Sequence, residues 1–227
     1  MTERGMIFNA EMVRAILDGR KTQTRRIMKP QPEPCPRGGH WWPSNVFKTM
    51  LHVEDEMQNG KGCWGGLVGD ACPFGDVGDR IWVRETWARY NIDQNRHDIA
   101  YRATTPADWP EEGRWRPSIH MPRTASRIQL EITDVRVERL NAISEEDAQR
   151  EGVHTEVWDQ TVVARNYAAR DEFFQFWSED MPHYVEMNQL YRSSFRSLWE
   201  SIYGSENWLA NPWVWVIEFK RVEGGAA

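Results

Sequence analysis

The chain has 227 residues, of which 40% are hydrophobic and 27% are charged, and its formal net charge is −6. This composition is ordinary for one or two globular domains, and it argues against a protein that binds a long nucleic-acid duplex through an extended basic surface. No secretory signal or apolar membrane span is visible, and three cysteines do not suit a disulfide framework, so we expect a cytoplasmic protein that does not bind membranes.

The first predicted element is a helix over residues 7–18. Asn9 is a good N-cap residue, and Gly19 suits the position just after the last turn. The segment that follows, residues 22–27, is typical of a short strand or an extended turn. The apolar stripe of the helix consists of Met12, Val13, Ile16 and Leu17.

A long insertion at about residues 29–77 comes next. It is rich in proline and glycine and has little periodicity, so we expect irregular structure there. Residues 78–90 begin with a turn and continue as a strand, and residues 91–125 form a second, polar insertion. In residues 127–140 the apolar positions alternate but change parity near Asp134, which predicts a strand with a bulge or bend.

The second half of the chain is predicted to contain three helices and a final strand. Residues 143–153 form a short helix, because Ser144 is a good N-cap and acidic residues fill the first turn. Residues 168–180 and 187–203 show the periodicity of amphipathic helices. Residues 212–222 form the strand, on which one face carries Trp213, Trp215, Ile217 and Phe219.

The chain shows neither an internal repeat nor a clear linker, so we expect a single α+β domain. The domain spans residues 1–222, with insertions at about 29–77 and 91–125, a helical insertion at about 154–203, and a tail at 223–227.

Four possible metal ligands fall in the first insertion. Zinc bound to them could order a segment that lacks its own apolar core. Their spacing lacks the close pairs typical of zinc sites, so unrelated thiols and a surface histidine are the simpler interpretation. The four residues are Cys35, His40, Cys63 and Cys72.

The sequence GRKTQTRR at residues 19–26 concentrates four cations and two threonines directly after the first helix. A buried lysine loses its proton more easily than an exposed one, and a neutral lysine can act as a general base for a hydroxyl group. An exposed basic strand is the simpler interpretation of this segment taken alone. If the strand began at Lys21, then Lys21 and Thr24 would lie on opposite faces. A shared site therefore requires that Lys21 still lies in the turn.

Four short segments, in their order along the chain, resemble an ASCH domain, a member of the PUA-like superfamily. The amino-acid sequence around CPFGDVGDRIWVRETW and NPWVWVIEFKRV is similar to that of phage and prophage ASCH proteins. The resemblance covers both ends of the chain but not residues 29–70 or 154–186. The four segments are GRKTQTRR, GDRIWV, ISEEDAQREGV and VWVIEFKRV.

The resemblance implies a small PUA-like β-barrel with flanking helices, and ligands such as RNA, DNA or modified nucleosides. A short bacterial branch of the family hydrolyses N4-acetylcytidine to cytidine and acetate. Carried over to this chain, its residues are Lys21 as base, Thr24 as nucleophile and Glu151 as the acid that protonates the leaving amine. Arg26 would stabilise the oxyanion or hold the ligand, and no metal or organic cofactor is required.

Two other functions remain open. The chain could be a PUA-like module that binds a modified nucleoside or a short single-stranded nucleic acid without catalysis. It could also be an assembly or accessory protein of a phage, with protein partners that the sequence does not identify. In the binding module Trp82, Trp87 and Trp215 would stack on a base, and Arg25, Arg26 and Arg84 would contact phosphate.

Overall fold

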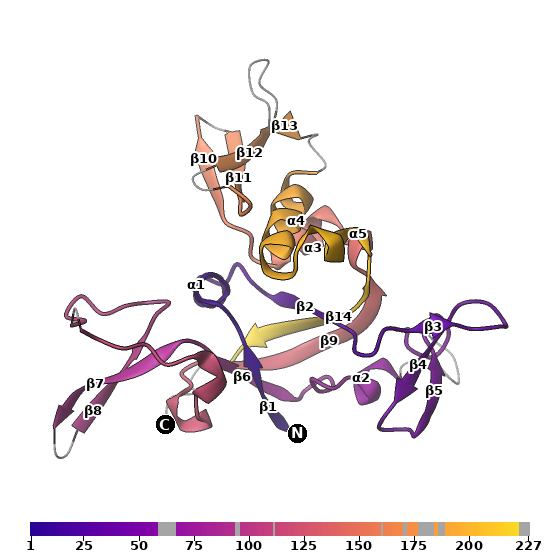
Figure 1. Ribbon diagram of the computed structural model, residues 1–227, viewed down its shortest axis with the longest axis horizontal. Coiled ribbons are helices and arrows are strands. Elements are labelled where there is room, and N and C mark those ends of the chain that lie inside the picture. The colour runs from indigo at the N-terminus through magenta and orange to yellow at the C-terminus, as the bar shows by residue number, and fades with distance from the viewer. Residues whose placement is uncertain are drawn as a thin grey trace.

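The computed structural model describes residues 1–58, 67–93, 96–110, 112–159, 161–169, 172–176, 184–185 and 189–222. The chain has an α+β fold built on a central five-stranded sheet (Figure 1). The outer pair β1–β6 is parallel, and the other neighbours are antiparallel. In sheet order the strands are β1 (Glu3–Ile7), β6 (Arg80–Arg84), β9 (Gln129–Arg139), β14 (Trp213–Arg221) and β2 (Gln23–Ile27).

The long strands β9 and β14 form the middle of this sheet. The register shifts between Glu218 and Phe219, which pair with Asp134 and Ile132 respectively. Thr133 is therefore an extra residue on β9, and the predicted bulge near Asp134 is confirmed.

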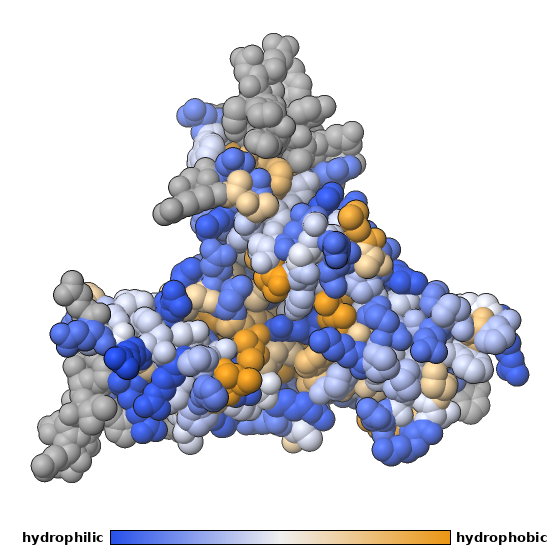
Figure 2. All heavy atoms as spheres, viewed as in Figure 1, coloured by the Kyte–Doolittle hydropathy of each residue, from blue (hydrophilic) through white to orange (hydrophobic). Residues whose placement is uncertain are grey.

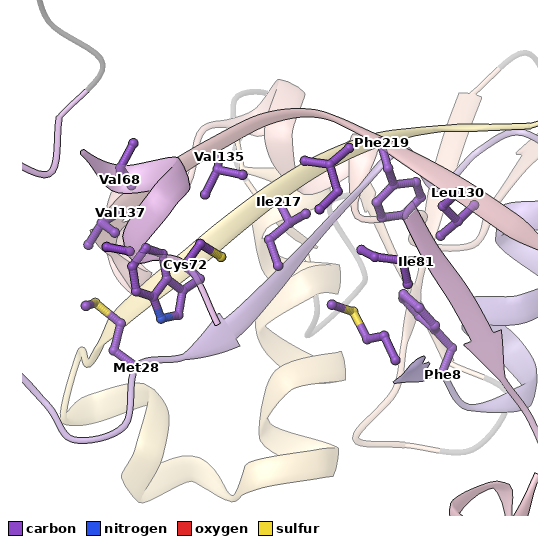
Figure 3. Packing of buried hydrophobic residues seen from close by; sticks show 14 of the residues in the cluster. Phe8, Met28, Val68, Cys72, Ile81, Leu130, Val135, Val137, Ile217 and Phe219 are labelled. Atoms are coloured by element: carbon purple, nitrogen blue, oxygen red, sulfur yellow. The ribbon is translucent and has the colours of Figure 1, made fainter. Parts of the chain in front are cut away.

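Both faces of β14 are buried. One face contributes Trp213, Trp215, Ile217 and Phe219 to the main apolar core, as the alternation predicted. Figure 3 shows side chains from β6, β9 and β14 meeting in this core beside Phe8, Met28 and Cys72. On the other face Val214 and Val216 pack against α4 (Leu190–Tyr203) and α5 (Ser205–Leu209).

The first helix, α1 (Ala10–Leu17), begins directly after its predicted N-cap Asn9, three residues later than the predicted range of 7–18, because Ile7 belongs to β1. The Asn9 Oδ1 atom accepts a hydrogen bond from the Met12 backbone N–H at 2.8 Å, which satisfies one free donor of the first turn. Gly19 follows the helix with a φ of 75°, a conformation that suits glycine. The chain then passes through a turn and enters β2 at Gln23.

The predicted helix over residues 168–180 is wrong for the residues that the structure describes. Residues 172–176 form β12, which pairs with β11 in a second sheet beyond α4 (Figure 1). Aromatic residues favour strands when an apolar partner strand is available, and β11 supplies one. The proposed helical insertion at about 154–203 therefore begins with strands, and among its described residues α4 is the only helix. The strands are β10 (Thr155–Trp158), β11 (Thr161–Asn166), β12 (Glu172–Phe176) and β13 (Tyr184–Val185).

The first insertion is more regular than its composition predicts. It contains a three-stranded sheet and a short helix, and its buried Trp42, Leu51 and Val53 join the main core. These apolar side chains explain why the segment has fixed structure despite its prolines and glycines. Its elements are β3 (Glu33–Pro34), β4 (His40–Ser44), β5 (Thr49–His52) and α2 (Val68–Ala71).

The second insertion is a hairpin followed by single turns of 3₁₀-helix. The hairpin strands are β7 (Trp87–Asp93) and β8 (Arg96–Tyr101), and the turns are η1 (Ser118–His120) and η2 (Arg123–Ala125). After β9, η3 (Leu140–Ala142) leads into α3 (Glu145–Arg150), whose predicted N-cap is confirmed because Ser144 Oγ accepts from the Asp147 N–H at 3.1 Å.

The central sheet is not a closed barrel. Among the described residues no backbone ladder joins the outermost strands β1 and β2. A side chain does link them, since Arg26 Nη2 donates to the Ile7 carbonyl oxygen at 2.7 Å. No helix in the described part of the chain is both long enough and apolar enough to cross a membrane.

Candidate functional site

Lys21 lies in the turn between α1 and β2, as a shared site with Thr24 requires. Its backbone N–H donates to the Ala15 carbonyl at 3.0 Å, and it forms an isolated bridge with Glu151 outside the strand. Gly152 makes this approach possible. A Cβ atom there would lie 2.6 Å from the Cβ of Lys21, and its φ of 81° also favours glycine.

The Lys21 ammonium group and the Glu151 carboxylate form a buried ion pair. Lys21 Nζ lies 2.7 Å from Glu151 Oε2 and donates to the Glu151 backbone oxygen at 2.8 Å. The two side chains are only 0% and 3% exposed. Burial lowers the pKa of Lys21 because a buried charge loses its hydration, and the Glu151 carboxylate partly opposes this shift.

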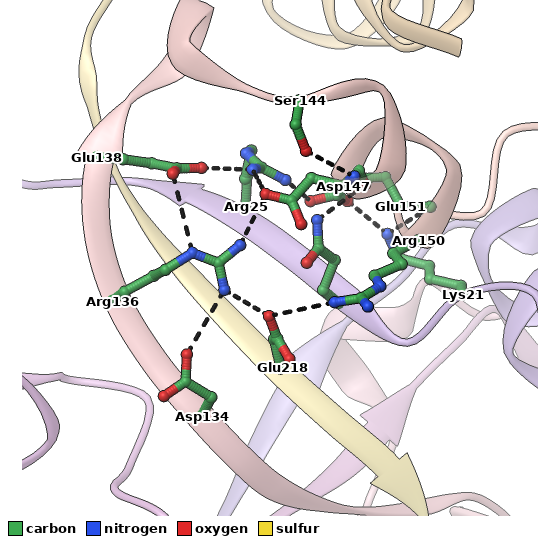
Figure 4. Close-up of polar contacts among 11 residues, drawn as sticks. Lys21, Arg25, Asp134, Arg136, Glu138, Ser144, Asp147, Arg150, Glu151 and Glu218 are labelled. Carbon is green, nitrogen blue, oxygen red and sulfur yellow. Dashed lines mark hydrogen bonds and ion pairs between the residues drawn. The ribbon is translucent and has the colours of Figure 1, made fainter. Parts of the chain in front are cut away.

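Arg25 lies at the centre of a charge network. Its side chain is 0% exposed, and its Nη1 atom contacts Glu151 Oε1 at 3.0 Å. Nη2 contacts Asp147 Oδ2 at 3.1 Å and also Glu138. Figure 4 shows the network continuing through Arg136. The charge of Arg25 is thus already matched by three carboxylates, and its side chain supports Glu151 from within.

An inner pocket adjoins this network at the free edge of β2. Thr24, Arg25, Arg26 and Glu151 line one side, and Met12 with residues of α4 between Phe195 and Tyr203 lines the other. The pocket is narrow, because its free volume accommodates about one water molecule. The Thr24 side chain has no hydrogen-bond partner among the described residues. The fold therefore brings Thr24 and Glu151 to one pocket, with Lys21 bonded to Glu151 behind it.

A larger hollow, the outer groove, adjoins the inner pocket. It is formed by β1 and the end of β2 with Lys29, Phe74, Arg84 and Tyr203. Of the predicted ligand-binding residues, Arg26 lines both spaces and Arg84 lines the groove.

The three tryptophans considered for base stacking lie in different places. Trp82 lies beside the groove, where its ring covers Gly5 and the Arg84 guanidinium lies 5.3 Å from the ring centre. Trp87 is buried near the β7–β8 hairpin with Met121 and Ala125. Trp215 is 1% exposed in the main core. The structure does not bring Trp87 or Trp215 to the groove or the inner pocket.

Sequence reasoning missed two aromatic residues of the site, Phe74 and Tyr203. Tyr203 is 39% exposed at the end of α4, and Phe74 follows α2 in the insertion. An exposed aromatic residue at a helix end is a weak signal, and nothing in its spacing relates it to residues 19–26.

The possible zinc ligands are only partly described, because Cys63 lies outside the described residues. In the part of the chain that is described, no group of three or more histidine, cysteine or acidic side chains could hold a metal ion. His40 Nδ1 lies 2.7 Å from Glu54 Oε1. Cys72 belongs to the main core, and burial raises the pKa of its thiol to about 12.

Comparison of the chain with models of known protein families, with curated proteins and with solved structures finds no match. The geometry of the inner pocket and the outer groove therefore carries the functional inference.

Proposed function

We propose that this chain is an amidohydrolase that removes the acyl group from N4-acylated cytidine-type compounds. The observation that carries the proposal is the 2.7 Å contact between Lys21 and Glu151 beside a pocket that Thr24 also lines. A lysine, a hydroxyl group and a carboxylate are suitable as base, nucleophile and proton donor for acyl transfer.

Lys21 serves as the base in this proposal. A neutral amine has two N–H donors and one lone pair, and the two donors match the backbone oxygen and Oε2 of Glu151. The lone pair is then left for the proton of the Thr24 hydroxyl. Burial favours the neutral amine because it lowers the pKa of Lys21.

The reaction has two steps. In the first, the Thr24 oxygen bonds to the acyl carbon while its proton moves to Lys21. The bond from the acyl carbon to the exocyclic nitrogen then breaks, and the nitrogen leaves as an amine with a proton delivered through Glu151. In the second step, water adds to the threonine ester, Glu151 accepts a water proton, and this proton returns to the Thr24 oxygen as the carboxylic acid leaves.

Arg26 is suited to stabilise the negative oxygen that forms on the acyl carbon. It lines the inner pocket, and its Nε atom is buried without a hydrogen-bond partner among the described residues. A buried N–H group without a partner is costly, and an oxyanion would satisfy it.

The finer fold assignment, an ASCH domain of the PUA-like type, belongs to the same proposal. The curved five-stranded sheet supports it, because the side chain of Arg26 on the outermost strand β2 reaches the backbone of Ile7 on the other outermost strand, β1.

The test is deacylation of N4-acetylcytidine and its longer-chain analogues, as nucleosides and as 5′-phosphates, followed by chromatography. The wild-type protein should release the free base compound, and Thr24→Val and Glu151→Gln should each lower the rate at least about 100-fold. The absence of turnover with every acyl group would mean that the chain binds such ligands without catalysis or has another function.

Two neighbouring residues provide matched controls. Thr22 is exposed two positions before Thr24, and Glu146 is exposed on α3 near Glu151. Thr22→Val and Glu146→Gln make the same chemical changes outside the pocket and should leave the rate within about twofold. An equal loss of deacylation rate in the control variants would contradict the assignment of Thr24 and Glu151 as catalytic residues.

A further inference from the structure

The outer groove is large enough for a ligand and opens beside the inner pocket. Its cavity volume is about 360 Å³, which is within the range of small-molecule sites. Ile7 and Phe74 contribute to its largely apolar surface. Figure 2 shows apolar side chains gathering over β1, β2 and the lower end of α4 in the middle of the molecule.

Three cations, Arg26, Lys29 and Arg84, line the groove, and no acidic residue is among the described residues that line it. The guanidinium groups of Arg26 and Arg84 each donate to a backbone carbonyl, of Ile7 and Ile119 respectively. The Nε atoms of both arginines are buried without a partner. None of the three cations forms an ion pair within the described part of the chain.

This arrangement contrasts with the rest of the site. The chain has a net charge of −6, and the buried cations Lys21 and Arg25 both contact carboxylates. Cations that gather without a counter-charge repel one another, and this unfavourable energy is removed when an anion binds between them. The groove thus combines a surface suited to a planar apolar group with charges suited to an anion.

We propose that the outer groove is a phosphate-binding subsite and that the substrate is an acylated nucleotide, as a monomer or within a single strand, rather than a free nucleoside. The inference rests on the proposed function for the identity of the base. The narrow inner pocket takes the acyl group, so the base, the sugar and the phosphate lie in the groove. Arg26 and Tyr203, which line both spaces, mark the boundary between them.

The first test measures binding of unreactive ligands to the wild-type protein by calorimetry. Cytidine 5′-monophosphate should bind at least about tenfold more tightly than cytidine. Added salt should weaken the binding of the phosphorylated ligand only. Equal affinities of the two ligands would overturn the proposal. Pentacytidylate that binds more tightly than the monophosphate identifies a strand as the source of the phosphate, and equal binding identifies a mononucleotide.

The second test removes two charges of the groove. The variant Arg84→Gln with Lys29→Gln should lose about tenfold or more in affinity for the monophosphate and keep its affinity for cytidine. The control Arg102→Gln with Lys48→Gln changes the net charge equally at two exposed positions outside the groove and should change neither affinity. If the double variant does not fold, the single variant Lys29→Gln, which changes an exposed side chain, should still weaken binding of the monophosphate. An unchanged affinity there overturns the proposal.

The two proposals can fail separately. A preference for the phosphorylated ligand without deacylation of any acylated compound would support the phosphate subsite and contradict the amidohydrolase function. Deacylation of nucleosides and nucleotides at equal kcat/KM would support the amidohydrolase function and contradict the phosphate subsite.

Discussion

Arg25 Nη1 lies 3.0 Å from the Oε1 atom of Glu151, while Lys21 lies 2.7 Å from Oε2 of the same carboxylate. Each oxygen of this buried group therefore has its own cation. If Lys21 loses its proton, Arg25 still neutralises Glu151 and holds its orientation. In the proposed reaction Arg25 is thus a positioning residue, because it allows the charge of Lys21 to change without leaving an unpaired carboxylate in the interior.

Replacing Arg25 with methionine should strongly destabilise the protein. The substitution keeps most of the side-chain volume but leaves Glu138, Asp147 and Glu151 without their shared cation. Removing one partner from a buried ion pair typically costs about 3–5 kcal/mol. The free energy of unfolding, measured with urea, should fall by about this amount.

The control for this prediction is Arg102→Met, which makes the same change at an exposed position. It should alter the free energy of unfolding by no more than about 0.5 kcal/mol. A loss for Arg25→Met as small as that of the control would mean that the network contributes little to stability.

The proposed deacylation should depend on pH through Lys21. Burial lowers the pKa of Lys21, and the charges of Arg26 and Arg25 lower it further. The base acts in its neutral form, so kcat should rise as pH increases through this lowered pKa and then become constant. Arg26→Gln removes one cation, so the pKa of Lys21 rises and the rising limb moves to higher pH.

Measuring kcat from pH 5 to 10 for the wild type and Arg26→Gln separates two effects. Loss of oxyanion stabilisation lowers the rate at every pH, whereas loss of the charge moves the curve along the pH axis. A rate that falls with rising pH, or a curve that Arg26→Gln moves to lower pH, would exclude Lys21 as the base.

Local signals predicted the helices and turns that build the site. Asn9 and Ser144 accept the hydrogen bonds expected of N-cap residues, and Gly152 has the positive φ that lets Glu151 approach Lys21. These features depend on a few consecutive residues, so the sequence displays them directly.

Features that depend on distant partners could not be predicted in the same way. The aromatic residues of 172–176 fit a helix or a strand, and pairing with β11 decides between them. The sequence predicts that Arg25 contacts phosphate, whereas the structure buries its side chain among carboxylates. Two of these carboxylates belong to Glu138 on β9 and Asp147 on α3, and no spacing rule connects either residue to residue 25. The PUA-like barrel and the ASCH family stay predictions.

Asp79 should stabilise the attachment of β1 in a pH-dependent way. Thr2 donates to both Asp79 oxygens at 2.6 Å, and these bonds lower the pKa of Asp79 from 3.8 to about 2. Because the folded-state pKa is the lower one, the stabilisation is complete above about pH 4 and is lost as pH falls through about 2. The difference in unfolding free energy between wild type and Asp79→Asn should therefore be largest near pH 6 and smallest near pH 2. A difference of the same size at pH 6 and at pH 2 would contradict this prediction.

In the proposed amidohydrolase, Leu198 should limit the length of the acyl chain that the inner pocket accepts. It is 6% exposed and lines the narrow inner pocket, opposite the wall that carries Thr24. Leu198→Ala removes three carbon atoms, so the ratio of kcat/KM for butyryl over acetyl substrates should rise about tenfold or more. The same change costs about 2–5 kcal/mol of stability, so rates are compared at a temperature where the variant is folded.

Leu209→Ala is the matched control, because Leu209 lies on α5 and is 72% exposed. It should leave the butyryl-to-acetyl ratio unchanged. The ratio is the decisive quantity, because partial unfolding lowers both rates together whereas a wider pocket favours only the longer chain. An unchanged ratio in Leu198→Ala would place the acyl group outside the inner pocket, and Thr24 would then no longer be positioned to attack it.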